Sequence, residues 1–259
     1  GFNIKAKNGL PFVMQTLILN DPHTGVAKSI MHASYICSLK TACETVVSAK
    51  YLAPKNRRLN VMIIGLGVQG QANLNAWLAA EKLGYFNIGQ FFLIDINRDN
   101  LRSAEELVKK NANIAVRTET EAKMLVPEAD VIVTLTHSDK ENLVMYDWLK
   151  KGVYIATLGS FPEVDPNIHL KANKLVVDSW EQNVHRGEFQ KLIAEGKITK
   201  NSMYGEELPQ LMANGFGREN NNELISAALI GLGSIDIRYS DFIYNNAVKN
   251  NIGTYFVFI

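Results

Sequence analysis

Hydrophobic and polar positions divide the chain into regions of different periodicity. Residues 12–19 and 26–31 have the character of β-strands and flank a segment rich in turn residues, which predicts a hairpin. Apolar positions at helical spacing follow from Ser34, a candidate helix cap, until Pro54. The first region is therefore expected to form a hairpin and one long helix.

From residue 60 onward, apolar strand-like runs alternate with amphipathic segments. This alternation predicts an α/β fold of the Rossmann type, with a doubly wound parallel sheet and right-handed crossovers. After Asp178 the rhythm stops, and residues 183–212 and 223–250 have the spacing expected of helices on either side of a polar loop. The strands are expected near residues 61–64, 91–95, 113–117, 131–136, 153–158 and 174–178.

The change in pattern predicts two domains. Residues 58–199 would form a dinucleotide-binding Rossmann domain, inserted into a second, discontinuous α+β domain. That second domain, residues 1–57 and 200–259, would serve substrate binding and dimerisation. Substrate would then bind in the cleft between the two domains.

A glycine motif, G-x-G-x-x-G, follows the first predicted Rossmann strand. Gly65 would make the tight turn, Gly67 would let the backbone approach a pyrophosphate, and Gly70 would let the helix pack on the strand. Val68 and Gln69 complete the loop, whose free N–H groups at a helix N-terminus favour anions. A turn that binds nothing can have the same pattern. The strand before it, the helix after it and an acid beyond favour a cofactor site.

That acid is Asp95, at the end of the second predicted Rossmann strand. A carboxylate there accepts hydrogen bonds from the adenosine ribose and repels a 2′-phosphate, which favours NAD. Arg98, three residues on, would instead pair with that phosphate, so NADP is the alternative. In a protein without cofactor, Asp95 would be a loop acid capping a helix that starts near Asn100.

The nicotinamide ring is expected near the C-terminal end of the fourth strand, beside the point where the strand order reverses. Thr136, His137 and Ser138 follow that strand and are candidates to line the ring. The alternative is a polar loop after a buried strand.

A second G-x-G sequence occurs at Gly231 and Gly233. It lacks the third glycine, no β-branched strand precedes it, and residues 223–248 around it have helical spacing. We expect these glycines to mark close packing within a helix, and we assign them no cofactor role.

Composition narrows the function classes. The 27 basic and 26 acidic residues nearly cancel, so no global field attracts nucleic acid or a membrane surface. Cys37 and Cys43 fit a reducing compartment, and we expect a cytoplasmic protein. The five histidines have no ligand spacing, so no metal is expected. No apolar run reaches the ~18 residues of a membrane span, so we expect neither a membrane span nor a signal peptide.

Several short sequences occur in a distinctive order: 20–25 in the hairpin, 39–53 in the helix, the glycine motif, and then 146–152, 176–179, 217–219 and 251–254. This order resembles that of the ornithine cyclodeaminase/mu-crystallin family. Within the family the chain is most similar to dehydrogenases that release 2,3-diaminopropionate from an amino-acid adduct. That similarity lies in residues 146–149, 177–182 and 206–211.

The resemblance implies an enzyme that binds NAD or NADP and oxidises an amine to an imine or reduces an imine. The expected substrate is a small amino acid or imino acid. It also implies a homodimer, paired through the domain that contains the hairpin. A cyclodeaminase and a non-catalytic dinucleotide-binding relative are the alternatives.

Two departures from the family pattern affect the substrate side. Lys40 stands where the family has an arginine that holds the substrate carboxylate, so it keeps the charge without the bidentate fork. The alternative role for Lys40 is an exposed partner of Glu44. Phe161 stands nearest the place of the cyclodeaminase aspartate and cannot accept a proton, which disfavours cyclodeamination. Glu163 is the candidate base nearby, unless it is a solvated loop acid.

A third departure lies ahead of the hairpin, where the family supplies further basic residues that bind the carboxylate. Lys5 and Lys7 lie near that place but do not align with the family pattern. We expect N-terminal strands of the second domain to be missing from this sequence. The alternative is that the substrate half of the site is incomplete, in which case activity itself would be doubtful.

Overall fold

The computed structural model describes residues 9, 14–136 and 142–257. Its internal contacts divide the chain into two compact units. The smaller comprises residues 1–40 and 232–259, and the larger comprises residues 41–231. Helix α2 (Ser34–Leu52) begins in the smaller unit and ends in the larger.

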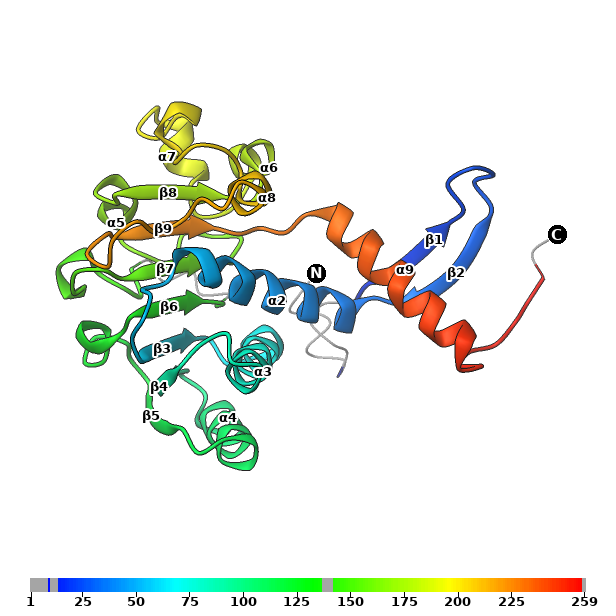
Figure 1. The fold of residues 1–259 in the computed structure, drawn as a ribbon, viewed down its shortest axis with the longest axis horizontal. Coiled ribbons are helices and arrows are strands. Elements are labelled where there is room, and N and C mark those ends of the chain that lie inside the picture. Colours follow the sequence, from blue (N-terminus) through cyan, green and yellow to red (C-terminus); the bar gives the residue numbers. More distant parts are fainter. Residues whose placement is uncertain (1–8, 10–13, 137–141, 258–259) are drawn as a thin grey trace. The chain divides into compact units, whose positions relative to one another are not determined.

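A seven-stranded parallel sheet forms the centre of the larger unit, in the order β5-β4-β3-β6-β7-β9-β8 (Figure 1). The chain runs outward from β3 to β4 and β5, then returns to place β6 on the other side of β3. The strand order therefore reverses between β3 and β6, where α/β sheets bind ligands. The strands are β3 (Leu59–Ile64), β4 (Ile88–Ile94), β5 (Ala115–Glu119), β6 (Val131–Thr134), β7 (Tyr154–Thr157), β8 (Lys174–Val177) and β9 (Ile225–Ala228).

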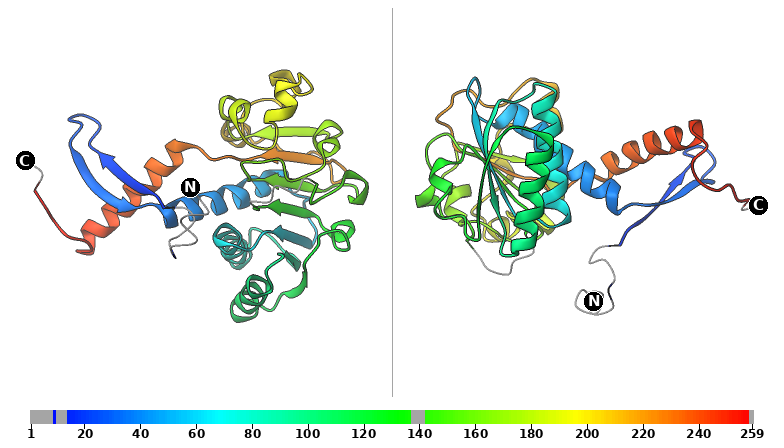
Figure 2. Two further views of the ribbon diagram at one scale, coloured as in Figure 1. Left: turned by 180° about the vertical axis from the view of Figure 1, so that it is seen from behind. Right: turned by 90° about the horizontal axis from the view of Figure 1, so that it is seen from below.

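Alternate residues of β3 belong to different clusters of buried side chains, as the two-residue period of a strand requires. Val61 and Ile63 pack in one cluster with Trp77 of α3, whereas Met62 and Ile64 belong to the other. Both faces of the sheet are thus covered (Figure 2). The helices of this unit are α3 (Val68–Lys82), α4 (Arg98–Asn111), α5 (Pro166–Leu170), α6 (Trp180–His185), α7 (Gln190–Ala194) and α8 (Leu208–Ala213), with 3₁₀ turns η1 (Val126–Glu128), η2 (Tyr146–Trp148) and η3 (Lys200–Ser202).

All six predicted Rossmann strands are present, but the helix predicted over residues 223–250 is present only from residue 233 onward. Strand β9 occupies 225–228 between β7 and β8, and α9 (Gly233–Lys249) begins only after it. Gly231, with φ +88°, lies in the link between strand and helix, and Gly233 opens the helix. These glycines therefore mark a strand-to-helix connection and not packing within a helix.

The predicted helical region 183–212 is also broken into shorter pieces. Helices α6, α7 and α8 and the turn η3 are separated by Gly187, Gly196 and Gly205, all with positive φ. Glycine adopts this left-handed backbone at little cost, and it ends helices for that reason. The spacing of apolar residues alone did not predict these breaks in the helix.

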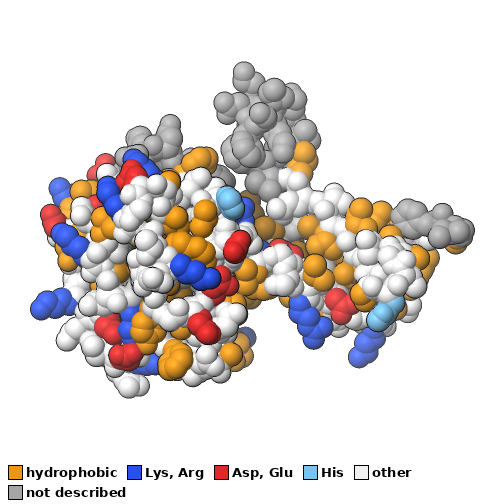
Figure 3. Space-filling view, turned by 90° about the horizontal axis from the view of Figure 1, so that it is seen from above, with side chains coloured by type: hydrophobic (Ala, Val, Ile, Leu, Met, Phe, Trp, Pro, Cys, Tyr) orange, Lys and Arg blue, Asp and Glu red, His pale blue; other side chains and the backbone are white. Residues whose placement is uncertain are grey.

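The smaller unit contains the predicted hairpin. Strands β1 (Thr16–Asn20) and β2 (Ala27–His32) pair antiparallel, and the Asp21 carboxylate accepts hydrogen bonds from the backbone N–H groups of His23 and Thr24 in the turn. Figure 3 shows hydrophobic side chains among polar ones on the surface of this unit. The large apolar residues that are exposed on the unit include Ile18 and Ile30 of the hairpin and Ile237 and Phe242 of α9.

Candidate functional site

The glycine motif forms the loop between β3 and α3. Gly65 has φ +92°, and a Cβ there would lie 2.8 Å from the carbonyl oxygen of Leu135. A Cβ at Gly70 would lie 2.0 Å from the carbonyl oxygen of Gly65. By contrast, a Cβ at Gly67 would meet nothing within 4 Å. Gly65 and Gly70 are therefore required by the fold, whereas the open side of Gly67 leaves room for a ligand to approach the backbone.

Helix α3 begins directly after its N-cap residue, Gly67. Because glycine has no side chain, no side-chain hydrogen bond caps the first N–H groups of this helix. An uncapped helix N-terminus presents free N–H groups, and these favour an anion. Val68 in the first turn is 75% exposed, and Gln69 is half-buried. This geometry fits a bound pyrophosphate group.

Asp95 lies directly after β4 and faces the glycine loop. Its carboxylate accepts hydrogen bonds from the backbone N–H of Leu66 at 2.7 Å and from the side-chain amide of Asn100 at 3.1 Å. The cap of α4 is Asn97, so the alternative that Asp95 caps this helix does not hold. Arg98 is the first residue of α4, and its side chain is exposed. Asp95 therefore lies against the glycine loop. An acceptor for the ribose of a bound dinucleotide is required at this position.

The carboxylate of Glu163 is buried at the C-terminal end of β6. Thr134 Oγ1 donates to Glu163 Oε2 at 2.7 Å, and both the backbone N–H and the hydroxyl of Thr136 donate to Oε1 at 2.6 Å. Glu163 is fully buried, so its interpretation as a solvated loop acid was wrong. His137 and Ser138, also predicted to line the nicotinamide, lie outside the described residues.

Burial raises the pKa of Glu163 to about 7, because a charged carboxylate loses its hydration there, and the nearby Glu188 adds a smaller effect in the same direction. The hydrogen bonds from Thr136 and Thr134 oppose the shift. The neutral acid fits the geometry, since a proton on Oε2 would be donated to the Thr134 hydroxyl while Oε1 keeps both donors from Thr136.

A second buried carboxylate, Glu188, lies behind the first. It accepts hydrogen bonds from the backbone N–H of Glu163 at 2.8 Å and of Val164 at 3.3 Å. Its Oε1 also lies 3.0 Å from His169 Nε2, and His169 Nδ1 lies 2.8 Å from Ser226 Oγ. Sequence reasoning missed Glu188, His169 and Ser226, because separate elements carry them and no spacing connects them.

Lys40 is buried within the smaller unit. Its Nζ lies 3.1 Å from Asp236 Oδ2 of α9, and 7% of its side chain is exposed. The alternative of an exposed partner of Glu44 was therefore wrong. Phe161, which the sequence comparison placed nearest the cyclodeaminase aspartate, is 58% exposed.

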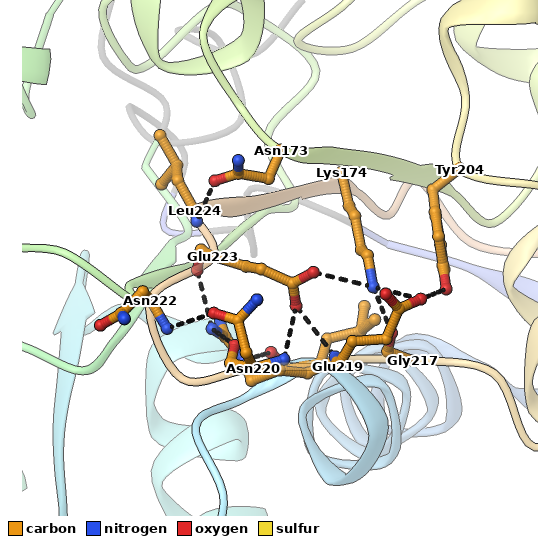
Figure 4. A network of polar contacts seen from close by, with 11 residues as sticks. Asn173, Lys174, Tyr204, Gly217, Glu219, Asn220, Asn222, Glu223 and Leu224 are labelled. Atoms are coloured by element: carbon orange, nitrogen blue, oxygen red, sulfur yellow. Dashed lines mark hydrogen bonds and ion pairs between the residues drawn. The ribbon is translucent and has the colours of Figure 1, made fainter.

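The Gly217-Arg218-Glu219 sequence supports the fold. Arg218 Nε donates to the carbonyl oxygen of Leu52 at 2.7 Å, which satisfies the C-terminal end of α2. Lys174 Nζ lies 3.1 Å from a carboxylate oxygen of Glu219 and also 3.1 Å from one of Glu223 (Figure 4). These contacts fasten the loop before β9 to the start of β8.

Comparison with known proteins places this geometry in a family. The sequence profile of the ornithine cyclodeaminase/mu-crystallin family matches residues 2–251. The chain belongs to the ornithine cyclodeaminase/mu-crystallin family. This confirms the resemblance that the order of the sequence motifs indicated.

Members of the ornithine cyclodeaminase/mu-crystallin family with named activities are similar over most of the chain. The N-((2S)-2-amino-2-carboxyethyl)-L-glutamate dehydrogenase of Staphylococcus aureus is 32% identical over 252 residues, which are 96% of this chain and 73% of that protein. The Thermococcus litoralis Δ1-pyrroline-2-carboxylate reductase, solved with NADH and L-proline, has a TM-score of 0.87 and 29% identity, covering 97% of this chain and 77% of that one. An archaeal alanine dehydrogenase dimer with bound NAD has a TM-score of 0.85 and 30% identity, and the match covers 98% of this chain and 78% of that one.

The solved structures of these family relatives confirm the predicted Rossmann-type α/β fold. In the part of the chain that the structure describes, no helix is both long enough and apolar enough to cross a membrane.

Proposed function

We propose that the protein is an NAD-dependent oxidoreductase that acts on the C–N bond of an amino acid or of its imine. The carrying observation is the glycine loop, where Gly67 is open above the uncapped N-terminus of α3 and Asp95 lies alongside. Residues 65–70 would hold the pyrophosphate, and Asp95 would accept from the adenosine ribose. NAD fits better than NADP, since a 2′-phosphate would meet this carboxylate. When bound, NAD supplies the hydride acceptor and NADH the hydride donor.

At the nicotinamide end, Thr136 would line the ring together with His137 and Ser138. Glu163 fixes Thr136 through both its backbone N–H and its hydroxyl. The carboxyl oxygens of Glu163 are buried and engaged by Thr134 and Thr136. Glu163 therefore supports the reaction as a positioning residue that acts through Thr136, and not as the candidate base that the sequence suggested.

On the substrate side, Lys40 is the candidate that holds the carboxylate of a small amino acid or imino acid. The buried ammonium is neutralised by Asp236 in this structure. A substrate carboxylate would compete with Asp236 for Nζ, in a single-point contact without the fork of arginine.

Replacing Lys40 with methionine is expected to raise the KM of the amino-acid substrate about 10- to 100-fold, since a charge-assisted hydrogen bond is lost. The affinity for NADH should stay unchanged. The matched control is Lys28→Met, because Lys28 also pairs with an aspartate of α9, Asp241, at 3.7 Å. Steady-state kinetics with both variants measure the difference. An equal KM in the Lys40 variant and the wild type would remove Lys40 from the site.

The reaction class is tested with a panel of small amino acids and their cyclic imines. Formation of NADH that depends on an amine, or consumption of NADH that depends on an imine, would support the proposal. Release of ammonia without net change in NADH would indicate a cyclodeaminase instead. Binding of NADH with no turnover of any member of the panel would indicate a dinucleotide-binding protein without catalysis.

We propose a homodimer formed through the hairpin and α9 of the smaller unit. Ile18 and Ile30 on the hairpin and Ile237 and Phe242 on α9 are exposed in the single chain, and apolar surface of this kind is common at subunit interfaces. The related archaeal alanine dehydrogenase was solved as a dimer.

We place the protein in the cytoplasm, where unpaired thiols stay reduced.

A further inference from the structure

A cavity of about 460 Å³ lies within the larger unit, at the N-terminal ends of β3 and β4. The glycine loop lies at the other, C-terminal end of β3. Residues 54–58 lead into the start of β3 beside it, and residues 84–87 lead into the start of β4. Because β3 is six residues long, roughly 20 Å of strand separates this edge from the glycine loop. The cavity is therefore separate from the proposed cofactor site. It is lined by residues 49–50, 53–59 and 84–87.

The charged side chains that line this cavity are all cations. They are Lys50, Lys55, Arg57 and Arg58. Arg57 is neutralised by Asp130 at 2.8 Å. Within the described residues the other three form no ion pair with a carboxylate, and Lys50 lies over the Tyr85 ring, 4.6 Å from its centre. Uncompensated charges of one sign around a hollow attract an anion.

The uncharged part of the lining is mainly apolar and aromatic, with two amide side chains, Asn56 and Asn87. Ala53, Pro54 and Leu59 are buried and form an apolar part of the wall. Tyr85 is 54% exposed, and Phe86 is held by Trp77, with 4.9 Å between the ring centres. Lys50 lies over one face of the Tyr85 ring, and the residue is still 54% exposed. A flat apolar group can therefore lie against the rest of the ring while an attached anion reaches the cations.

We propose that this cavity binds a nucleoside phosphate, with the base against Tyr85 and the phosphates at Lys55 and Arg58. Inorganic phosphate alone would leave the aromatic wall unused, and a neutral aromatic compound would leave the cations uncompensated. A volume of about 460 Å³ lies in the range that small-molecule sites occupy. The site is independent of the proposed reaction, since it uses none of the residues assigned to the cofactor or the substrate.

The test is calorimetric titration with ADP in the presence of saturating NADH, which keeps ADP out of the proposed cofactor site. One ADP should bind per chain. The double variant Lys55→Glu/Arg58→Glu should weaken this binding at least about tenfold, since two charge-assisted contacts are reversed. The matched control, Lys109→Glu/Lys110→Glu, makes the same charge change on exposed residues at the end of α4 and should bind as the wild type does.

Two further measurements keep the result specific. Tyr85→Ala should weaken ADP binding and leave the binding of inorganic phosphate unchanged. The affinity for NADH reports whether each variant is folded. The proposal is overturned if ADP does not bind under saturating NADH, if both double variants weaken ADP equally, or if inorganic phosphate binds as tightly as ADP.

Discussion

Replacing Gly67 with aspartate should abolish the binding of NADH and leave the fold intact. The first atom of a side chain at this position meets no protein atom, because a Cβ built there has nothing within 4 Å. It would instead enter the space that the pyrophosphate needs at the N-terminus of α3. The added carboxylate also repels the phosphates, and the two effects together should weaken NADH binding by at least about 100-fold. Titration of NADH fluorescence measures the loss.

The matched control for this variant is Gly67→Ala, which adds a small uncharged group and should weaken NADH binding far less. Gly70→Ala provides a contrast, because its Cβ would collide with the carbonyl of Gly65 and should lower the free energy of unfolding. If Gly67→Asp bound NADH with the affinity of the wild type, the cofactor would have to lie elsewhere and the assignment of the loop would fail.

The sequence predicted well those features that depend on neighbouring residues in the chain. The strand before Gly65, the helix after Gly67 and the hairpin with its turn at residues 20–25 each carry their own periodicity or turn residues. Strand β9 was missed because its sequence, Ile225-Ser-Ala-Ala, has only one strong strand former. Its conformation comes from β7 and β8, which pair with it on either side.

The same distinction applies to the candidate site. Gly67 and Asp95 were predicted because a fixed spacing connects them to the first two strands. The burial of Glu163 was not predicted, because it depends on Thr134 at the end of β6, on Thr136 just after that strand and on Glu188 from a later loop. A single acid in a proline-containing loop has no local pattern that separates a buried position from a solvated one.

Replacing Glu163 with glutamine should remove a pH dependence of stability that the wild type shows. In the folded protein the pKa of Glu163 is about 7, raised from an ordinary value of 4.5, so between these pH values the folded state binds more protons than the unfolded state. The free energy of unfolding of the wild type should therefore decrease as the pH rises from 4.5 to 7. The decrease is roughly 3 kcal/mol for a shift of this size.

Glutamine fits the same hydrogen bonds as the neutral acid, because its oxygen can accept from Thr136 and its amide can donate to the Thr134 hydroxyl. The variant should consequently be as stable as the wild type near pH 5 and more stable near pH 8. Urea unfolding at both pH values measures this, with Glu106→Gln on the exposed side of α4 as the control that keeps the wild-type trend. Because Glu163 fixes Thr136 beside the proposed nicotinamide position, the change in kcat that accompanies its ionisation near pH 7 should also disappear in the variant. The free energy of unfolding of the Glu163→Gln variant could instead decline between pH 5 and pH 8 in parallel with that of the wild type. That result would show that another group titrates and that Glu163 is charged throughout.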